Sequence, residues 1–193
     1  MREYSAIGLD VSDKTMKAVG LDATGAIGWR REVKCERQAV KKVFEAMPRV
    51  VIALETGGHT GWLARMLVQH GHDVVVANAR KVKAIWADER KSDWRDAETL
   101  ARLARTDRAL LRPVTLRSES AQRDLNVLKA REALVRARTQ LVCTVRSLVK
   151  GMGGAMASGG TEAFPRRCRE TLGEAERASL EGLLQAIEEI TEQ

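Results

Sequence analysis

The strongest constraint on the fold is an uninterrupted apolar run at residues 50–54, which ends at Glu55 and a following Thr-Gly-Gly. A short apolar run bounded by turn residues is typical of a strand that is buried on both faces of a sheet. Three further strand patterns precede it, at residues 6–11, 17–21 and 27–33, with a turn signal at residues 22–25 between the last two. We therefore expect the chain to open with three antiparallel strands, followed by a buried one.

Helical patterns alternate with strands in the rest of the first half. Residues 38–47 and 62–70 have the apolar spacing of helices and are stopped by Pro48 and Gly71, and residues 74–77 form a fifth strand pattern. Residues 78–105 are helical in two pieces, with a break near Lys91 and Ser92. A three-strand meander followed by alternating helix and strand predicts a mixed α/β sheet with flanking helices, over residues 1–112.

The second half, over residues 117–193, is predicted to be helical. Five glycines in residues 151–160 predict a flexible turn between a long helix at 117–150 and an acidic amphipathic helix at 173–193. We expect the two helices to form a long antiparallel hairpin. The second helix ends without a capping signal, so we expect the chain to be truncated there. Two adjacent apolar columns of the long helix repeat every seven residues, as in a coiled coil: Val127, Leu134, Leu141 and Leu148 beside Leu128, Val135, Val142 and Val149.

The charge distribution favours a polyanionic partner. The formal net charge of the chain is +7, with +5 over residues 117–150 and −4 over residues 151–193. A basic chain favours nucleic acid over membrane, and aromatic residues, at 4%, are too few for a surface on which bases stack. Arg131 and Arg138 on the long helix either belong to a solvated face or follow a phosphate backbone, and the sequence leaves both interpretations open.

Several observations bear on location. No apolar run approaches the ~18 residues of a membrane span, and the N-terminus lacks the apolar stretch of a signal peptide. Three widely spaced cysteines, Cys35, Cys143 and Cys168, have neither metal-ligand nor redox spacing and fit reduced thiols. We expect a cytoplasmic, nucleoid-associated protein with no membrane partner.

Four carboxylates are the candidate chemical groups. Asp10 interrupts the first apolar strand, Glu55 ends the buried strand, and Asp93 and Asp96 share one face at the start of a helix. Acids at strand ends and on a helix can converge at the rim of a sheet, where Mg²⁺ takes one or two carboxylates plus waters and substrate phosphate. Two such ions can stabilise the attacking and leaving oxygens at a phosphorus. Taken singly, Asp93 is also explained as a helix N-terminal acid and Asp10 as a turn cap.

The order and context of these acids resemble the DEDD transposases of the insertion-sequence-110 family. The resemblance covers nearly the whole chain. It rests on GLDVSDKTMKAVGLD at 8–22, ALETGG at 53–58, VANARKVKAIWADERKSDWRDAETLARL at 76–103 and LVCTVRSLVKGMGG at 141–154. The third block is the most specific, because a basic helix precedes Lys-Ser-Asp-x-x-Asp-Ala.

The resemblance implies a RuvC-like N-terminal domain with a ribonuclease H-like fold. In it, Asp10, Glu55, Asp93 and Asp96 would be the catalytic acids that hold Mg²⁺, with Mn²⁺ as a substitute. It also implies that the chain is the N-terminal part of an insertion-sequence transposase or recombinase, with DNA and a structured guide RNA as partners. Family members continue into a domain with a serine nucleophile, so we expect this chain alone to be incomplete for strand transfer.

Basic residues surround the third block. Each of them can contact backbone phosphate or simply belong to a solvated, charge-balancing surface: Arg80, Lys81 and Lys83 before the acids, and Lys91 and Arg95 beside them. His59, which follows Gly58 near Glu55, is assigned no role.

Two other functions remain open from the sequence. The chain could be a self-sufficient Mg²⁺-dependent nuclease or junction resolvase of the same fold, or a non-catalytic regulator that binds nucleic acid. A phosphotransfer enzyme of the actin and sugar-kinase type would need a second matching domain to close over ATP, for which the chain has no room. The seven-residue repeat also requires a partner surface, and we expect a homo-oligomer through the helical hairpin.

Overall fold

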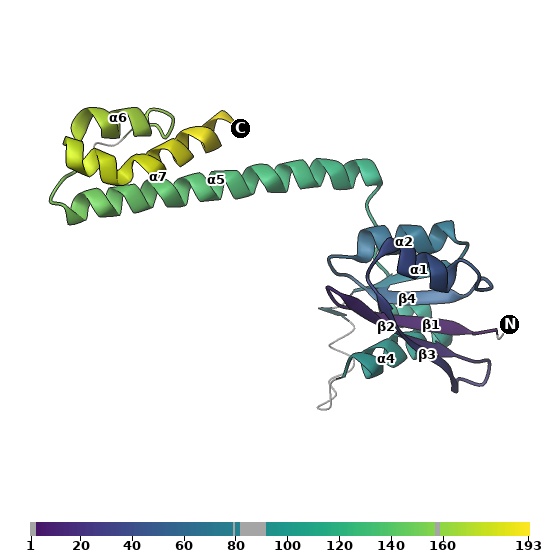
Figure 1. Cartoon of the computed structure of the whole chain (residues 1–193). Coiled ribbons are helices and arrows are strands. Elements are labelled where there is room, and N and C mark those ends of the chain that lie inside the picture. Colours follow the sequence, from purple (N-terminus) through teal and green to yellow (C-terminus); the bar gives the residue numbers. More distant parts are fainter. Residues whose placement is uncertain (1–2, 79, 82–91, 157–158) are drawn as a thin grey trace. The chain divides into compact units, whose positions relative to one another are not determined.

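The structure is a computed structural model that describes residues 3–78, 80–81, 92–156 and 159–193. It divides into two compact units, Met1–Arg117 and Ser118–Gln193. Figure 1 shows the first in purple to teal and the second in green to yellow.

A five-stranded mixed sheet forms the centre of the first unit. Its strands are β1 (Ala6–Val11), β2 (Thr15–Leu21), β3 (Ile27–Lys34), β4 (Val51–Glu55) and β5 (Asp73–Ala77), in the order β3-β2-β1-β4-β5. The first three strands are antiparallel neighbours, whereas β4 runs parallel to β1 and β5 parallel to β4. The predicted mixed α/β sheet is confirmed, and this architecture is consistent with a ribonuclease H-like domain.

Helices cover both faces of this sheet (Figure 1). Helices α1 (Arg37–Phe44) and α2 (Thr60–Gln69) pack on one face, over a core of large side chains that includes Ile7, Leu9, Ile52, Leu54 and Phe44. Helix α4 (Asp93–Thr106) packs on the other face, and a short 3-10 helix, η1 (Arg108–Leu111), follows it. Strand side chains alternate between the two faces, so each strand contributes to both cores.

The α4 face is built from small residues, which bring the helix close to the sheet. Ala6 and Ala53 lie in the core under α4. Gly8 lies on the same face, two residues after Ala6 on β1 and directly opposite Ala53 on β4. A Cβ atom added at Gly8 would come within 1.9 Å of the Ala97 carbonyl oxygen and 2.5 Å of the Ala101 nitrogen. The helix backbone therefore occupies the space that a side chain at position 8 would need.

The described residues of the second unit form three helices, α5 (Glu119–Gly151), α6 (Phe164–Thr171) and α7 (Glu174–Glu192). Their shared core lies at the C-terminal end of α5, where Val145 and Val149 contact Phe164, Leu184 and Ile187. The predicted long two-helix hairpin is not confirmed. Along the chain, α6 stands between the two predicted helices, and the shared core reaches only the last turns of α5. The glycine-containing segment after α5 therefore leads into α6 before the chain reaches α7.

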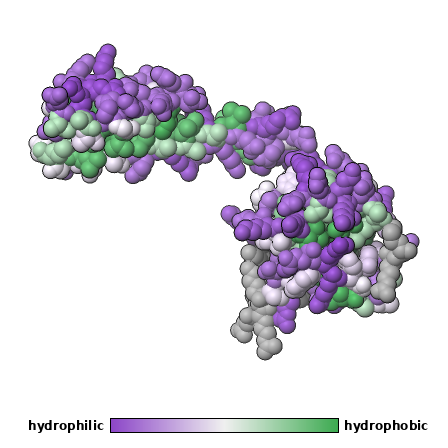
Figure 2. All heavy atoms as spheres, viewed as in Figure 1, coloured by the Kyte–Doolittle hydropathy of each residue, from purple (hydrophilic) through white to green (hydrophobic). Residues whose placement is uncertain are grey.

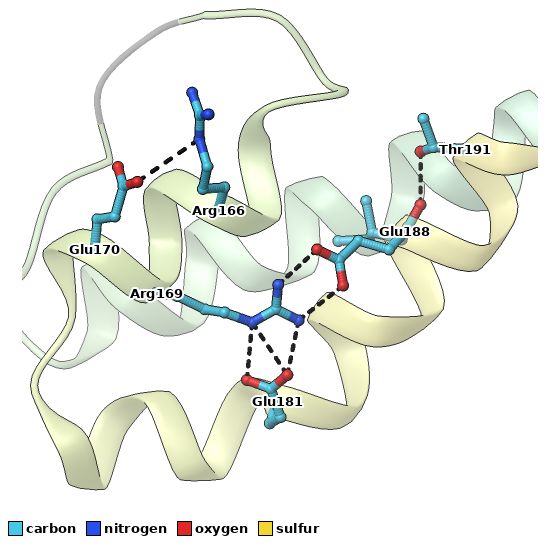
Figure 3. A network of polar contacts seen from close by, with 7 residues as sticks. Arg166, Arg169, Glu170, Glu181, Glu188 and Thr191 are labelled. Carbon is cyan, nitrogen blue, oxygen red and sulfur yellow. Dashed lines mark hydrogen bonds and ion pairs between the residues drawn. The ribbon is translucent and has the colours of Figure 1, made fainter.

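An arginine joins α6 to α7. Arg169 donates hydrogen bonds to both Glu181, at 2.7 Å, and Glu188, at 2.8 Å (Figure 3). These bonds are the leading cause of the lowered pKa of each glutamate and of the raised pKa of Arg169. Among the described residues, nearby Arg166 forms an ion pair with Glu170 on its own helix, at 3.6 Å. Arg169 thus links two helices, whereas Arg166 supports one.

The two apolar columns of α5 are only partly covered. Leu141 and Val142 pack against the shared core, but Val127 and Leu128 are 69% and 64% exposed. Figure 2 shows hydrophobic side chains among hydrophilic ones along this helix. The predicted stripe is therefore present, and the core of the second unit covers only its C-terminal part.

Cys35, Cys143 and Cys168 are all free thiols, and of the three only Cys168 is fully buried. Among the described helices, none combines the length and the apolar character needed to cross a lipid bilayer.

Candidate acidic site

Two of the four predicted acids lie side by side at the ends of parallel strands. Strands β1 and β4 are paired in register up to Leu9 and Leu54, so the next pair in this register is Asp10 and Glu55. Neighbouring strands are about 4.8 Å apart. Because Leu9 and Leu54 point into the core under α1 and α2, the alternation of side chains directs both acids to the α4 face. Both carboxyl side chains are half-buried.

Helix α4 brings the other two acids to the same end of the sheet. Its residues Leu103 and Ala104 share a core with Ala6, and Ala97 lies against Gly8. The helix therefore runs opposite to β1. From Gly8 to Asp10 the strand advances about 6.7 Å, and from Ala97 back to residue 93 the helix advances about 6 Å in the same direction. The first turn of α4 thus lies level with the end of β1.

The start of α4 is fixed by a side-chain cap. The Ser92 hydroxyl accepts a hydrogen bond from the Arg95 backbone N–H at 3.3 Å, which is a common way to satisfy the first turn of a helix. Asp93 and Asp96 both lie in this first turn, as predicted. Asp93 is exposed, and Asp96 is half-buried.

A lysine and a tryptophan connect this turn to the sheet. Lys17 on β2 is the antiparallel partner of Asp10. Its ammonium group pairs with Glu32 on β3 and lies over the ring of Trp94, 5.2 Å from the centroid. Trp94 also packs against the core around Ala97. The contact places the first turn of α4 near the Asp10 position and gives a positive charge to the neighbourhood of the acids.

A small polar cleft of about 100 Å³ contains the two strand acids. It is lined by Asp10, Glu55 and the loops that follow their strands, residues 11–13 and 56–60. Thr60 holds the second loop in place, because its hydroxyl donates to the Glu55 carbonyl at 2.8 Å and accepts from the Gly57 N–H at 2.7 Å. The cleft is therefore preformed on the strand side.

The four acids do not form a closed ligand cluster. Within the part of the chain that the structure describes, no group of three or more His, Cys, Asp or Glu side chains is arranged to hold a metal ion. The geometry thus brings Asp10 and Glu55 into one cleft and sets Asp93 and Asp96 on the adjoining helix turn. A larger apolar hollow of about 540 Å³ lies elsewhere, between α2, β5 and residues 113–116, and none of the four acids lines it.

The predicted nucleic-acid-binding residues fall into three groups. Arg80, Lys81 and Arg95 are exposed in the first unit, Arg95 next to the acids on α4. Lys83 and Lys91 lie outside the described residues. On α5, Arg131 is exposed and Arg138 half-buried.

His59 is a cleft residue for which sequence reasoning found no role. It lies at the start of α2, and it lines the cleft together with Asp10 and Glu55. The signal in the sequence that could have indicated a place in the cleft was its position four residues after Glu55. The sequence alone did not show that the intervening loop turns the histidine back toward the acids.

Comparison with known proteins decides the family. A family model described as a transposase, of the DEDD insertion-sequence-110 type, matches residues 7–153. The chain belongs to this family. The matched residues of this DEDD transposase family member include all four acids. They end at the glycines after α5.

The similar curated proteins are also transposases. A probable family 20 transposase of Pseudomonas aeruginosa is 32% identical over 91% of this chain and 50% of its own length. A putative transposase of Sinorhizobium fredii is 31% identical over 79% of this chain and 38% of its own length. The transposase for insertion sequence element IS1111A of Coxiella burnetii is 28% identical over 82% of this chain and 42% of its own length. The chain thus spans about half the length of these relatives, or less.

Proposed function

We propose that this chain is the RuvC-like, metal-binding part of a DEDD transposase that cleaves and transfers DNA strands. In this proposal Asp10, Glu55, Asp93 and Asp96 together hold Mg²⁺, with Mn²⁺ as a substitute. Bound divalent ions would stabilise the negative charge that develops on the attacking and leaving oxygens at phosphorus. The strand order and directions described above support the ribonuclease H-like fold that such a site requires.

One observation carries the proposal. Two acids at the ends of parallel neighbours β1 and β4 face the side of the sheet on which α4 places two more. The donor chemistry fits, because carboxylate oxygens are the ligands that Mg²⁺ prefers, and one or two of them suffice when waters and substrate phosphate complete the shell. Asp10 and Glu55 in one cleft meet that minimum, and in this proposal Asp93 and Asp96 add to it.

Nucleic acid is the proposed partner of this site. Arg95 lies on the same helix turn as the acids, with Arg80 and Lys81 as further exposed cations of the first unit. Arg131 and Arg138 on α5 extend the basic character to the second unit, where phosphate contacts would add affinity without reading sequence. We also propose a structured guide RNA as a partner, as the resemblance to the family implies. Association of copies through the exposed apolar columns of α5 follows from the seven-residue repeat.

A metal titration tests the function. We expect isothermal titration of the chain with Mg²⁺ and Mn²⁺ to show binding that is weakened at least about tenfold by Asp10→Asn or Glu55→Gln. Glu45→Gln is the matched control, because Glu45 is an exposed acid that pairs with Lys41 on α1 and lies outside the acidic cleft. Equal binding in all variants would contradict the proposal.

A second assay separates the other candidate functions. Metal-dependent cleavage of branched DNA by this chain alone, abolished by Asp10→Asn, would identify a self-sufficient nuclease. DNA binding that survives the loss of all four acids and needs no metal would identify a non-catalytic regulator. We expect neither, but rather DNA binding that Mg²⁺ strengthens through the acids.

A further inference from the structure

His59 lies where the acidic cleft meets helix α2. The histidine is the residue that precedes the helix, and its side chain is half-buried. It lines the cleft with Asp10 and Glu55. Thr60, which is 4% exposed, fixes the backbone beside it through the hydrogen bond to the Glu55 carbonyl. The imidazole is thus attached to a rigid part of the site.

Trp62 determines which nitrogen of His59 carries the proton. The indole Nε1 of Trp62 lies 3.0 Å from Nδ1 of His59. An indole N–H can only donate, so Nδ1 accepts with its lone pair and the proton of the neutral ring is on Nε2. The rings of His59 and Trp62 meet edge to face, with centroids 5.9 Å apart. The Arg37 guanidinium lies over the Trp62 ring, 5.4 Å from its centroid. The orientation of the imidazole is therefore held through Trp62.

The Nε2–H group is an uncommitted donor among acceptors. Across the described residues, Nε2 of His59 has no hydrogen-bond partner in the structure. Two hydroxyl groups of the same cleft are already used, since Ser12 donates to the Thr15 carbonyl at 2.7 Å and Thr60 donates to the Glu55 carbonyl. The carboxylates of Asp10 and Glu55 can only accept when ionised.

We propose that Nε2–H of His59 donates a hydrogen bond to a phosphate oxygen of the DNA backbone bound at the acidic cleft. This inference rests on the proposed function, since it adds a substrate contact to the same site. A protonated Nε2 has no lone pair for a metal ion, so the geometry makes His59 a donor to the substrate and not a ligand of the metal. A neutral donor also suits this place, because it holds a phosphate without forming an ion pair with the acids.

Two substitutions separate this role from a structural one. In His59→Asn the amide oxygen can take the place of Nδ1 and accept from Trp62, but the donor at the Nε2 position is lost. In His59→Gln the longer amide reaches the Nε2 position and can donate there, but the acceptor for Trp62 is lost. A substrate contact therefore predicts that Gln is tolerated better than Asn, and a purely structural role predicts the reverse.

The measurement is the affinity of the full chain for a short fluorescein-labelled DNA duplex in the presence of Mg²⁺, by fluorescence anisotropy. We expect His59→Asn to weaken binding about tenfold, as for a hydrogen bond to a charged group, and His59→Gln to stay within about twofold of the unmodified chain. His70→Asn, at the other end of α2, is the matched control and should change nothing. Nitrogen NMR of the three histidines should show the Nε2–H form of His59, with a shift of that resonance on DNA addition.

The outcomes are distinct. Equal affinity in all variants, equal loss in both His59 variants, or greater loss in His59→Gln would overturn the role of His59 while leaving the metal site in place. In that case Mg²⁺ binding that still depends on Asp10 would show that the proposed function itself holds. If the unmodified chain binds no DNA with Mg²⁺, both the proposed function and this inference are overturned.

Discussion

The close approach of α4 to the sheet at Gly8 is a quantitative test of how the site is assembled. In Gly8→Ala, the new Cβ would lie 1.9 Å from the Ala97 carbonyl oxygen. Since close C···O contacts are about 3.3 Å, the helix or the strand must move by about 1.4 Å. Overpacking costs about 1–3 kcal/mol, and this clash belongs at the upper end because the new Cβ meets two backbone atoms of the helix, at 1.9 and 2.5 Å. The entropic gain of replacing glycine, about 0.5–1 kcal/mol, offsets part of this cost. We expect a net loss of about 2 kcal/mol.

The assay is urea unfolding followed by tryptophan fluorescence. All four tryptophans, at positions 29, 62, 86 and 94, belong to the first unit, so the signal reports on that unit alone. A loss of about 2 kcal/mol should lower the urea midpoint by roughly 1 M, and Mn²⁺ affinity should fall with it because the displaced helix carries two of the acids.

The matched control for this experiment is Gly57→Ala in the cleft loop. A Cβ atom at Gly57 would meet only the Thr60 hydroxyl at 3.8 Å, an ordinary contact. We expect this variant to unfold within about 0.5 kcal/mol of the unmodified chain, as surface substitutions do. If Gly8→Ala behaves like this control, the argument that α4 is seated on Gly8 is refuted.

Other parts of the molecule give further tests. Arg169→Met should lower the thermal stability of the helical unit by circular dichroism, whereas Arg166→Met should not. Because Arg169 lowers the pKa of its two glutamate partners, its stabilising effect is present above their ordinary pKa and is lost as pH falls through the lowered values; a pH profile unchanged by Arg169→Met would contradict this link. Burial lowers the pKa of His72, so stability of the first unit should fall as pH drops below about 6.5, and His72→Gln, which can still donate to the Phe44 carbonyl, should remove that part of the pH dependence in urea titrations. Arg131→Ser and Arg138→Ser should each reduce the slope of log affinity for DNA against log NaCl concentration by about one, measured by fluorescence anisotropy. Unchanged slopes would show that these residues do not contact DNA phosphates.

The sheet was predictable because its signals are local. The predicted strand at 6–11 coincides with β1, and the apolar run at 50–54 lies within one residue of β4 at each end. The first four residues of β1 and the middle three of β4 are continuously buried, and both correspond to short apolar runs that a single sequence contains. The start of α4 was equally visible, because Ser92 is a capping residue and both acids follow it within the first turn.

The arrangement of the second unit was less predictable because it depends on contacts distant in sequence. The apolar columns of α5 indicated a helix with a partner, but not that only its last turns would be covered. Helix α6 was missed because its apolar contacts, through Phe164 and Cys168, are few and lie in a strongly basic segment. The fork from Arg169 to Glu181 and Glu188 joins residues 12 and 19 positions apart, beyond the reach of helical spacing rules.

The candidate site was predictable in part, because it depends both on local sequence signals and on contacts between residues distant in sequence. The residue types and order predicted four acids, and the strand register explains why Asp10 and Glu55 meet. The direction of α4, which places Asp93 and Asp96 at the same end, followed only from its packing on the sheet, with Ala97 on Gly8 and Leu103 near Ala6. The role of Trp62 in orienting His59 likewise appears only in three dimensions, since neither residue suggests it alone.

Paramagnetic broadening by Mn²⁺ tests the central claim most directly, because it reports which residues surround the bound ion. Amide signals of the nitrogen-labelled chain would be followed during addition of substoichiometric Mn²⁺. If the four acids form one site, signals around Asp10, Glu55 and the first turn of α4 should broaden together at the lowest additions, and Asp10→Asn should abolish the effect at all three segments. Broadening confined to one segment, or centred on other acids, would contradict the account.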